Sequence, residues 1–166
     1  RVAIVDIDAH HGNGTQDIFW NDPRVAYVSF HEWPLYPGTG RLDERGGPNA
    51  PDSVCNLPFP SGATGEVYLA AIDGVVTPFL ERFDADWLLI SAGYDAHRDD
   101  PLTGLALSAG DYGGIVRRLV ELAPARGRTI AFLEGGYDLD ALTNSVAATL
   151  PALLAQAAPL PEPATA

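Results

Sequence analysis

The sequence contains no methionine and only one cysteine, Cys55, among its 166 residues. A single cysteine excludes an internal disulfide framework and suits the reducing cytosol, so we expect a cytoplasmic protein. A complete translated chain normally begins with methionine, whereas Arg1 leads directly into the apolar run 2–5. We therefore expect this sequence to be a fragment whose N-terminal part is missing.

Basic residues are also scarce, with 10 Lys and Arg against 22 Asp and Glu and a formal charge of −12. Nonspecific nucleic-acid binding requires basic side chains that neutralise phosphates, so we expect no nucleic-acid partner. No apolar run reaches the roughly 18 residues of a membrane helix, and no signal segment opens the chain, so we expect no membrane partner. Hydrophobic residues nevertheless make up 46% of the chain, which is sufficient for a globular core.

Short apolar, β-branched segments alternate with amphipathic helical patterns along the chain. Segments that are apolar on both faces are typical of buried strands in a parallel sheet, and their alternation with helices predicts an α/β fold. Ser108 with Asp111 three residues later resembles a capping box, and Thr64 is a possible N-cap. The expected strands are 2–6, 25–30, 87–91 and 129–133; the expected helices are 66–82, 108–122 and one from Asp138 or Asp140 towards Leu154.

Two segments lack such patterns. Residues 32–53 are rich in proline and glycine and predict a long loop, which in a compact domain suggests a functional role. Residues 154–166 are rich in proline and alanine and predict a disordered tail after one domain spanning 1–153.

Polar side chains follow three of the predicted strands, in the segments 6–14, 92–101 and 134–138. The carboxyl ends of parallel strands meet at one edge of a sheet, where ligands bind in open α/β folds. We therefore expect the three segments to converge on one site.

The first segment carries Asp6, Asp8 and His10, which face the same side if the backbone is extended. Carboxylate oxygen and imidazole nitrogen both suit Zn²⁺, so Asp8 and His10 could form a metal clamp with Asp95 as the third ligand. Spacing alone leaves a second interpretation open, in which these side chains only cap helices and bind loop amides.

Four motifs in this order carry a specific resemblance. They are Asp-Ile-Asp-Ala-His-His-Gly-Asn-Gly-Thr-Gln at 6–16, Tyr-Pro-Gly-Thr-Gly at 36–40, Ser-Ala-Gly-Tyr-Asp-Ala-His at 91–97 and Leu-Glu-Gly-Gly-Tyr at 133–137. Over residues 1–153 the sequence resembles the histone deacetylase family, most closely its class II-like members and the bacterial histone deacetylases and acetylpolyamine amidohydrolases. The resemblance implies a three-layer, mostly parallel sheet of the arginase/deacetylase type, with the N-terminal part missing.

The resemblance also implies an activity. It is that of a zinc-dependent amide hydrolase that removes acetyl or acyl groups from lysine peptides or polyamines. Asp8, His10 and Asp95 match the zinc ligands of the family, with one Zn²⁺ per chain. Tyr137 matches the tyrosine that binds the substrate carbonyl and the developing oxyanion.

Further positions follow from the same resemblance. Asp6, His11 and Asn13 match residues that surround the metal ligands. In the family, the residues at the positions of Asp6 and Asn13 orient a pair of catalytic histidines. A structural monovalent cation, usually potassium, is expected at the main-chain carbonyls of Asp6, Asp8, His10 and Phe30, with the Asp6 carboxylate and the Ser29 hydroxyl. Tyr36 matches an aromatic wall of the acyl-lysine tunnel, and Gly135 and Gly136 match the backbone beside it.

The pair of histidines that acts as general base and acid in the family lies upstream of residue 1. His10 is assigned to zinc, and we expect His31 to bond locally at a strand end and His97 to orient the Asp95 loop. The 166 residues alone are therefore expected to be catalytically inactive.

Two alternatives stay open. An arginase-like binuclear hydrolase would need a further acidic ligand just after His10, where the chain has Gly12 and Asn13. Asp99 and Asp100 could supply it in principle, but we expect both to be solvated loop residues. A degenerate, non-catalytic module that binds acyl-lysine is the second alternative.

Overall fold

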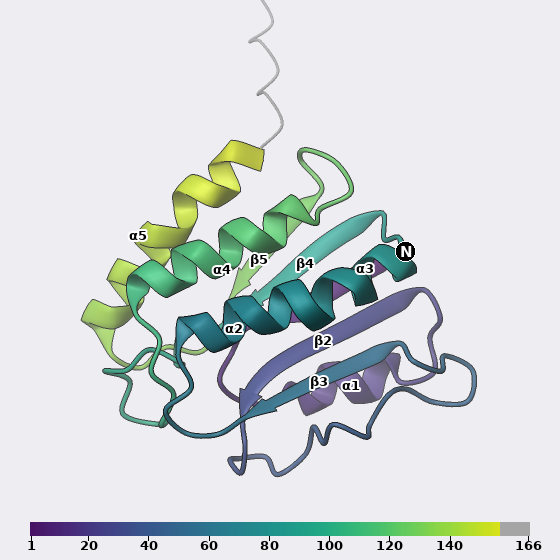
Figure 1. Ribbon diagram of the computed structural model, residues 1–166, viewed down its shortest axis with the longest axis horizontal. Coiled ribbons are helices and arrows are strands. Elements are labelled where there is room, and N and C mark those ends of the chain that lie inside the picture. Colours follow the sequence, from purple (N-terminus) through teal and green to yellow (C-terminus); the bar gives the residue numbers. More distant parts are fainter. Residues whose placement is uncertain (157–166) are drawn as a thin grey trace, which may run out of the picture.

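Among residues 1–156, which the computed structural model describes, five parallel strands form the centre of the molecule in the order β3-β2-β1-β4-β5 (Figure 1). This confirms the predicted α/β class and the four predicted strands. The strands are β1 (Val2–Asp6), β2 (Val25–Glu32), β3 (Val54–Phe59), β4 (Trp87–Ala92) and β5 (Thr129–Leu133).

Strand β3 was not predicted from the sequence. It contains Asn56 and Pro58, which are both unfavourable in strands, so its apolar pattern is interrupted. It lies at the edge of the sheet and pairs only with β2, where a proline that lacks an N–H group is tolerated.

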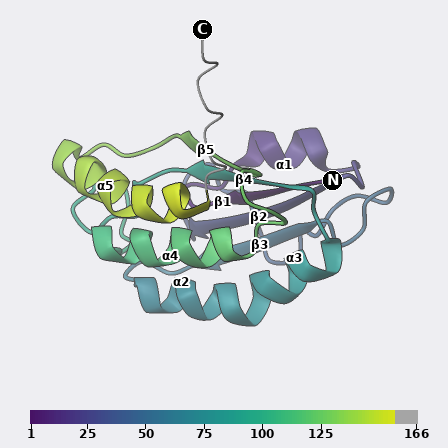
Figure 2. The same cartoon turned by 90° about the horizontal axis from the view of Figure 1, so that it is seen from above.

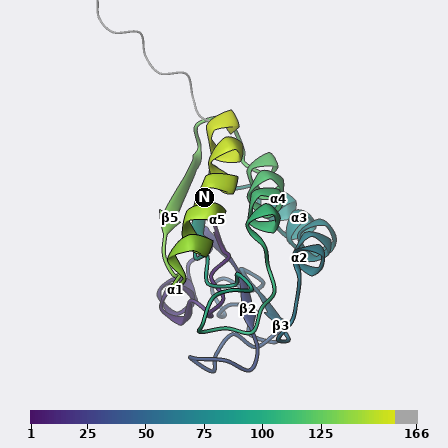
Figure 3. The same cartoon turned by 90° about the vertical axis from the view of Figure 1, so that its left-hand side faces the viewer.

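The helices form a layer on each face of the sheet. Helix α1 lies on one face, and α2, the π-helical segment η1, α3 and α4 cover the other (Figure 2). Helix α5 packs along α4 (Figure 3). The helical elements are α1 (Asn13–Phe19), α2 (Gly65–Ala71), η1 (Ile72–Val76), α3 (Thr77–Phe83), α4 (Ala109–Glu121) and α5 (Leu139–Gln156).

The helix boundaries largely follow the predicted signals. The helix expected at 66–82 is present, although a π-helical turn separates α2 from α3. Ser108 and Asp111 form the capping box at the start of α4, and Asp138 accepts the Ala141 amide at the start of α5 (2.8 Å). Thr64 occupies the N-cap position of α2 without a capping hydrogen bond from its side chain. Helix α1, only seven residues long, was not predicted.

Two expectations were wrong. Helix α5 continues to Gln156, so residues 154–156 are helical and do not begin a disordered tail; the rest of that predicted tail, 157–166, lies outside the described residues. Strand β5 was expected to be buried, but Ile130, Phe132 and Leu133 are exposed, because among the described elements β5 packs extensively against β4 and not against a helix.

The core lies between the central strands and the layer of α2, η1, α3 and α4. Val5, Val28 and Ile90 from three adjacent strands and Ile115 from α4 are fully buried there. This packing fixes the ends of β1 and β4 relative to each other, and the polar segments that follow them begin at those ends. Of the described helices, none is both long and apolar enough to cross a membrane.

Candidate metal centre and its surroundings

The segments that follow β1, β4 and β5 meet at the carboxyl edge of the sheet, as predicted from the parallel topology. The Ala9 amide donates to Asp95 Oδ1 (2.7 Å), which links the first segment to the second. The Gly135 amide donates to Asp8 Oδ2 (3.1 Å), and the Tyr94 amide donates to the Gly135 carbonyl (2.7 Å). Backbone amides thus hold all three segments together around two carboxylates.

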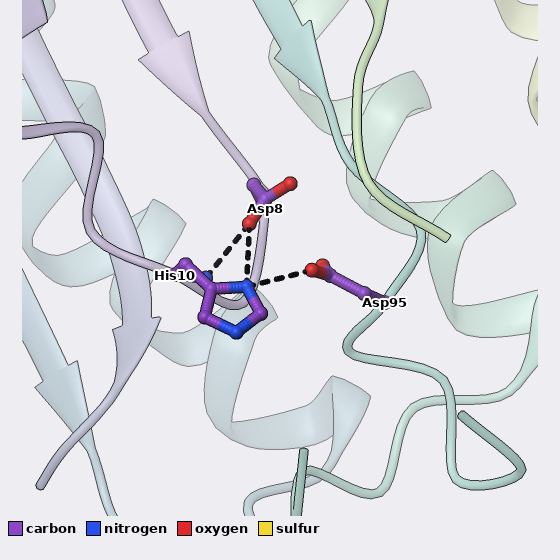
Figure 4. A group of neighbouring side chains, drawn as sticks. All are labelled: Asp8, His10 and Asp95. Atoms are coloured by element: carbon purple, nitrogen blue, oxygen red, sulfur yellow. Dashed lines mark hydrogen bonds and ion pairs between the residues drawn. The ribbon is translucent and has the colours of Figure 1, made fainter. Parts of the chain in front are cut away.

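Asp8, His10 and Asp95 point toward one another at this meeting point (Figure 4). One potential ligand atom from each side chain lies within 4.8 Å of the others. His10 Nδ1 is 2.8 Å from Asp95 Oδ2 and 3.2 Å from Asp8 Oδ1. The Asp95 side chain is fully buried, whereas those of His10 and Asp8 keep 22% and 16% of their surface exposed. The cluster is therefore open to solvent on the side of His10 and Asp8.

The charges of this cluster are strongly coupled. Hydrogen bonds to Asp8 and Asp95 raise the pKa of His10 to about 10. Burial opposes ionisation of Asp8, but its hydrogen bonds with His10 outweigh burial and keep its pKa below the usual range. Burial raises the pKa of Asp95. Two carboxylates thus stabilise a positive charge at the position of the imidazole.

The donor set fits a divalent cation. A bound cation would replace the proton of His10 and neutralise the two carboxylates that now surround it, and Zn²⁺ accepts this combination of nitrogen and oxygen ligands. Gly135 leaves the space for this arrangement, because a Cβ atom at that position would lie 2.6 Å from both Asp8 Oδ2 and Asp95 Oδ2. The second interpretation, that these side chains only cap helices and bind loop amides, accounts for some of their contacts but not for this convergence.

Asp6 lies beside the cluster but is not part of it. Its carboxylate accepts the Asp8 amide (3.1 Å) and the Tyr27 hydroxyl (2.9 Å). Burial, and then the charge of Asp8, raises the pKa of Asp6 to about 7. The position predicted to act with it, Asn13, begins α1 and is exposed.

Tyr137 follows the two glycines that approach the cluster. Its side chain is 54% exposed, and slight burial together with the negative charges of Asp95 and Asp8 raises the pKa of its phenol. The phenol therefore keeps its proton at neutral pH and can donate a hydrogen bond. Gly136, just before it, has a φ of 141°, a conformation that favours glycine.

Asp100 is not a solvated loop residue, contrary to the sequence-based expectation. It is buried, and its carboxylate accepts the Tyr137 amide (2.8 Å) and the Leu102 amide (3.0 Å). Its neighbour Asp99 is exposed, as expected. The difference arises because Asp100 faces the segment that follows β5, a contact across 37 residues of sequence.

The loop 32–53 is anchored by a buried polar network that was not predicted. Gln16 Oε1 accepts from His11 Nε2 (3.0 Å) and from Asn56 Nδ2 (2.8 Å), and Gln16 Nε2 donates to Glu44 in the loop (2.6 Å). His11 Nδ1 accepts the Thr39 hydroxyl (2.8 Å). His11, Gln16 and Thr39 belong to the first two motifs, but those motifs do not reveal the contacts, which span up to 40 positions.

His31 belongs to the same region. Its Nδ1 accepts the Ser29 hydroxyl (3.0 Å), and its Nε2 donates to the Gly40 carbonyl (2.9 Å). Burial, and then the neighbouring His11, lowers the pKa of His31 to about 4; burial also lowers that of His11. His31 thus bonds locally near the end of β2, as predicted, and both of its ring nitrogens are occupied.

Tyr36 and the residues predicted to bind potassium are close to the cluster. The Tyr36 ring is 80% exposed and meets the His10 ring edge-on, with 6.5 Å between centroids. In the sheet, Asp6 pairs with Ser29, which precedes the buried Phe30.

The sequence matches the profile of the histone deacetylase domain over residues 1–153. The chain belongs to the histone deacetylase family. It is 44% identical over 158 residues to histone deacetylase 10, chloroplastic, of Oryza sativa subsp. japonica, covering 94% of this chain and 36% of the relative. It is 46% identical over 142 residues to a probable deacetylase of Archaeoglobus fulgidus, covering 84% of this chain and 40% of the relative. This family member therefore spans less than half the length of these relatives.

Solved structures of the family have the same fold. The HD domain of HDA15 superimposes with a TM-score of 0.88 at 38% identity, covering 93% of this chain and 45% of that one. The histone deacetylase Clr3 superimposes with a TM-score of 0.88 at 37% identity, covering 93% of this chain and 27% of the Clr3 chain. The predicted family and fold class are thus confirmed, whereas the cytoplasmic location stays a prediction.

A binuclear centre of the arginase type finds little support in this deacetylase domain. The described residues contain one cluster of three potential metal ligands, that of Asp8, His10 and Asp95. Both carboxylate oxygens of Asp100 are occupied by backbone amides, and Asp99 lies exposed beside His97.

Proposed function

We propose that this protein is a zinc-dependent amide hydrolase that removes acetyl or other acyl groups from lysine side chains or polyamines. In this reaction the amide C–N bond breaks and water is added, which gives a carboxylic acid and a free amine. The observation that carries the proposal is the convergence of Asp8, His10 and Asp95, with ligand atoms within 4.8 Å of one another. Membership of the histone deacetylase family supports the reaction class.

Asp8, His10 and Asp95 would hold one Zn²⁺ per chain through two carboxylates and His10 Nδ1. When bound, the ion would polarise the amide carbonyl and acidify a water molecule. The chain itself fixes the ligands: the Ala9 amide orients Asp95, the Gly135 amide orients Asp8, and the His10 amide donates to Asp8 Oδ1 (2.8 Å). Such supporting hydrogen bonds typically change metal affinity 10- to 100-fold when lost.

Tyr137 would donate its phenolic proton in a hydrogen bond to the substrate carbonyl oxygen, where negative charge develops. The raised pKa of the phenol keeps this donor protonated. Removal of one such donor at comparable sites costs about 3–4 kcal/mol, or a 10²- to 10³-fold loss in turnover.

Tyr36 and the glycines 135 and 136 would line the entrance for the acylated side chain. The exposed Tyr36 ring next to His10 offers an apolar surface for an aliphatic chain. The net charge of −12 would favour cationic substrates, such as lysine peptides or polyamines.

A structural potassium ion is proposed next to this site, at the carbonyls of Asp6, Asp8, His10 and Phe30. The Ser29 hydroxyl donates its proton to His31, so its lone pairs remain free to bind a cation. The buried Asp6 carboxylate would be stabilised by such an ion.

We further propose that the 166 residues alone do not hydrolyse amides. The four histidines are all in the described part of the chain, and His10 is assigned to the metal. Both ring nitrogens of His11 and of His31 are hydrogen-bonded, and His97 is buried with its Nδ1 accepting the Asp99 amide. His10, His11 and His31 are thus engaged, and His97 is a single histidine in the loop after β4 and not part of an adjacent pair.

The test compares the full-length protein with its Asp95→Ala and Asp99→Ala variants. We expect about one zinc per chain and hydrolysis of an acetyl-lysine peptide or an acetylpolyamine in the parent protein and in Asp99→Ala. Asp95→Ala should lose both, because it removes the fully buried ligand.

Four outcomes would contradict these proposals. Unchanged zinc in Asp95→Ala would exclude the assigned ligands. Two transition-metal ions per chain would favour an arginase-like centre, and acyl-lysine binding by the zinc-loaded full-length protein without turnover would favour a non-catalytic module. Robust hydrolysis by the isolated 166-residue chain would refute its proposed inactivity.

A further inference from the structure

Asp100 is a buried carboxylate with a contact pattern that the metal centre does not explain. Its residue exposure is 6%, and both of its oxygens accept backbone N–H groups. Oδ1 binds the Leu102 amide in its own loop, and Oδ2 binds the Tyr137 amide in the segment after β5. A single side chain therefore joins two loops that arise from neighbouring strands.

The two loops carry different parts of the proposed chemistry. The loop after β4 contains Asp95, whose carbonyl accepts the Thr103 hydroxyl (2.6 Å). The segment after β5 contains Tyr137, with Asp138 capping α5 immediately after it. The hydrogen bond from Tyr137 to Asp100 thus fixes the donor segment to the ligand loop.

Among the described residues, no hydrogen bond holds the side chain of Tyr137 itself. It is 54% exposed, and its hydroxyl makes no hydrogen bond to a described residue. The place of this side chain therefore depends on the backbone of Tyr137. The residue before it, Gly136, has a positive φ, a conformation that favours glycine. A backbone of this kind needs an anchor, and a charged acceptor gives a stronger hydrogen bond than a neutral one.

We propose that Asp100 is a positioning residue for Tyr137, which holds the backbone of that tyrosine and thereby sets the place of its phenol relative to the cluster of Asp8, His10 and Asp95. This inference rests on the proposed function of Tyr137 as a hydrogen-bond donor. Asp100 itself binds neither the metal nor the substrate.

The experiment is a double-mutant cycle in the full-length protein with Asp100→Ala, Tyr137→Phe and the combined variant. Asp99→Asn is the matched control, because this neighbouring carboxylate is exposed. We expect Asp100→Ala to lower kcat about 10- to 100-fold, with KM within about twofold and zinc content unchanged. Tyr137→Phe should lower kcat about 10²- to 10³-fold, and the combined variant should be no slower than Tyr137→Phe alone.

A second variant and a second measurement guard against misfolding. Asp100→Leu keeps about the size of the side chain but can accept neither amide. In a ¹⁵N-labelled sample, hydrogen exchange at the Tyr137 amide should be at least tenfold faster in Asp100→Leu than in Asp99→Asn. This readout does not depend on activity.

The outcomes separate the two proposals. If Tyr137→Phe is fully active, the proposed role of Tyr137 fails. If Tyr137→Phe lowers kcat and the combined variant is slower still by the full factor of Asp100→Ala, then Asp100 acts independently of Tyr137 and the positioning role is refuted. Loss of zinc in Asp100→Ala, or an unchanged exchange rate of the Tyr137 amide in Asp100→Leu, would also overturn it.

Discussion

Replacing Gly135 by alanine should disrupt metal binding without disrupting the fold. Gly135 does not have a positive φ, unlike Gly136, so its backbone conformation is accessible to alanine. The added Cβ atom would, however, lie 2.6 Å from Asp8 Oδ2 and 2.6 Å from Asp95 Oδ2. The effect is therefore steric and directed at two proposed ligands.

The expected size of the effect follows from these distances. An ordinary contact between carbon and oxygen is at least about 3.4 Å. Each of the two oxygens must therefore move away by about 0.8 Å, or the backbone must move. Metal-ligand distances tolerate only about 0.2 Å. Asp95 cannot turn away freely, because its other oxygen accepts the Ala9 amide. We expect zinc affinity to fall at least 10- to 100-fold, or about 1.4–2.8 kcal/mol.

The assay is a competitive zinc titration of the full-length protein with a chromogenic chelator. Gly114→Ala is the control, because its Cβ would meet only Leu69 Cδ1 at 4.0 Å and the position lies within α4. That substitution should leave zinc affinity unchanged and raise stability by about 0.5–1 kcal/mol. Equal zinc affinity in Gly135→Ala and the parent protein would refute the assignment of Asp8 and Asp95 as ligands.

Two further predictions concern the fold around the site. Gln16→Ala should lower the free energy of unfolding by about 1–3 kcal/mol and expose the loop 32–53 to proteolysis, because buried groups of His11 and Asn56 lose their shared partner. The control is Asp17→Ala, because Asp17 is exposed. Equal stability and equal protection from proteolysis in both variants would exclude an anchoring role for Gln16. Burial raises the pKa of Cys55 to about 11. The rate of its alkylation in the folded protein should therefore be slow at pH 8 and rise as the pH approaches 11. A rate at pH 8 equal to that of the protein unfolded in urea would contradict this burial.

The ligand cluster could be predicted because its information is local. Asp8 and His10 are two positions apart, and the rule that ligands bind at the carboxyl ends of parallel strands brings Asp95 to them. The resemblance to the family then added Tyr137, whose type and neighbours are again contained in a short motif. Strand order and spacing thus brought the proposed ligands together, whereas the role of Tyr137 followed from the resemblance.

The supporting residues could not be predicted, because their roles depend on distant contacts. Asp100 is buried and its neighbour Asp99 is exposed, although both precede the same proline; the contacts of Asp100 with the Leu102 and Tyr137 amides distinguish them, and the second of these spans 37 positions. Gln16 ends the first motif, but its partner Asn56 lies 40 positions away and outside the quoted motifs, so the motif alone does not reveal their contact. The edge strand β3 was missed for a related reason, since its Pro58 is acceptable only at an edge.

The unequal exposure of the three proposed ligands has a consequence for metal exchange. The Asp95 side chain is fully buried, so an ion would enter and leave past Asp8 and His10, whose ring meets that of Tyr36. We expect exchange to be stepwise, with the two accessible ligands released before the buried one. Small chelators should then strip the ion much faster than bulky ones of equal strength, and the aromatic ring at the entrance would govern that difference.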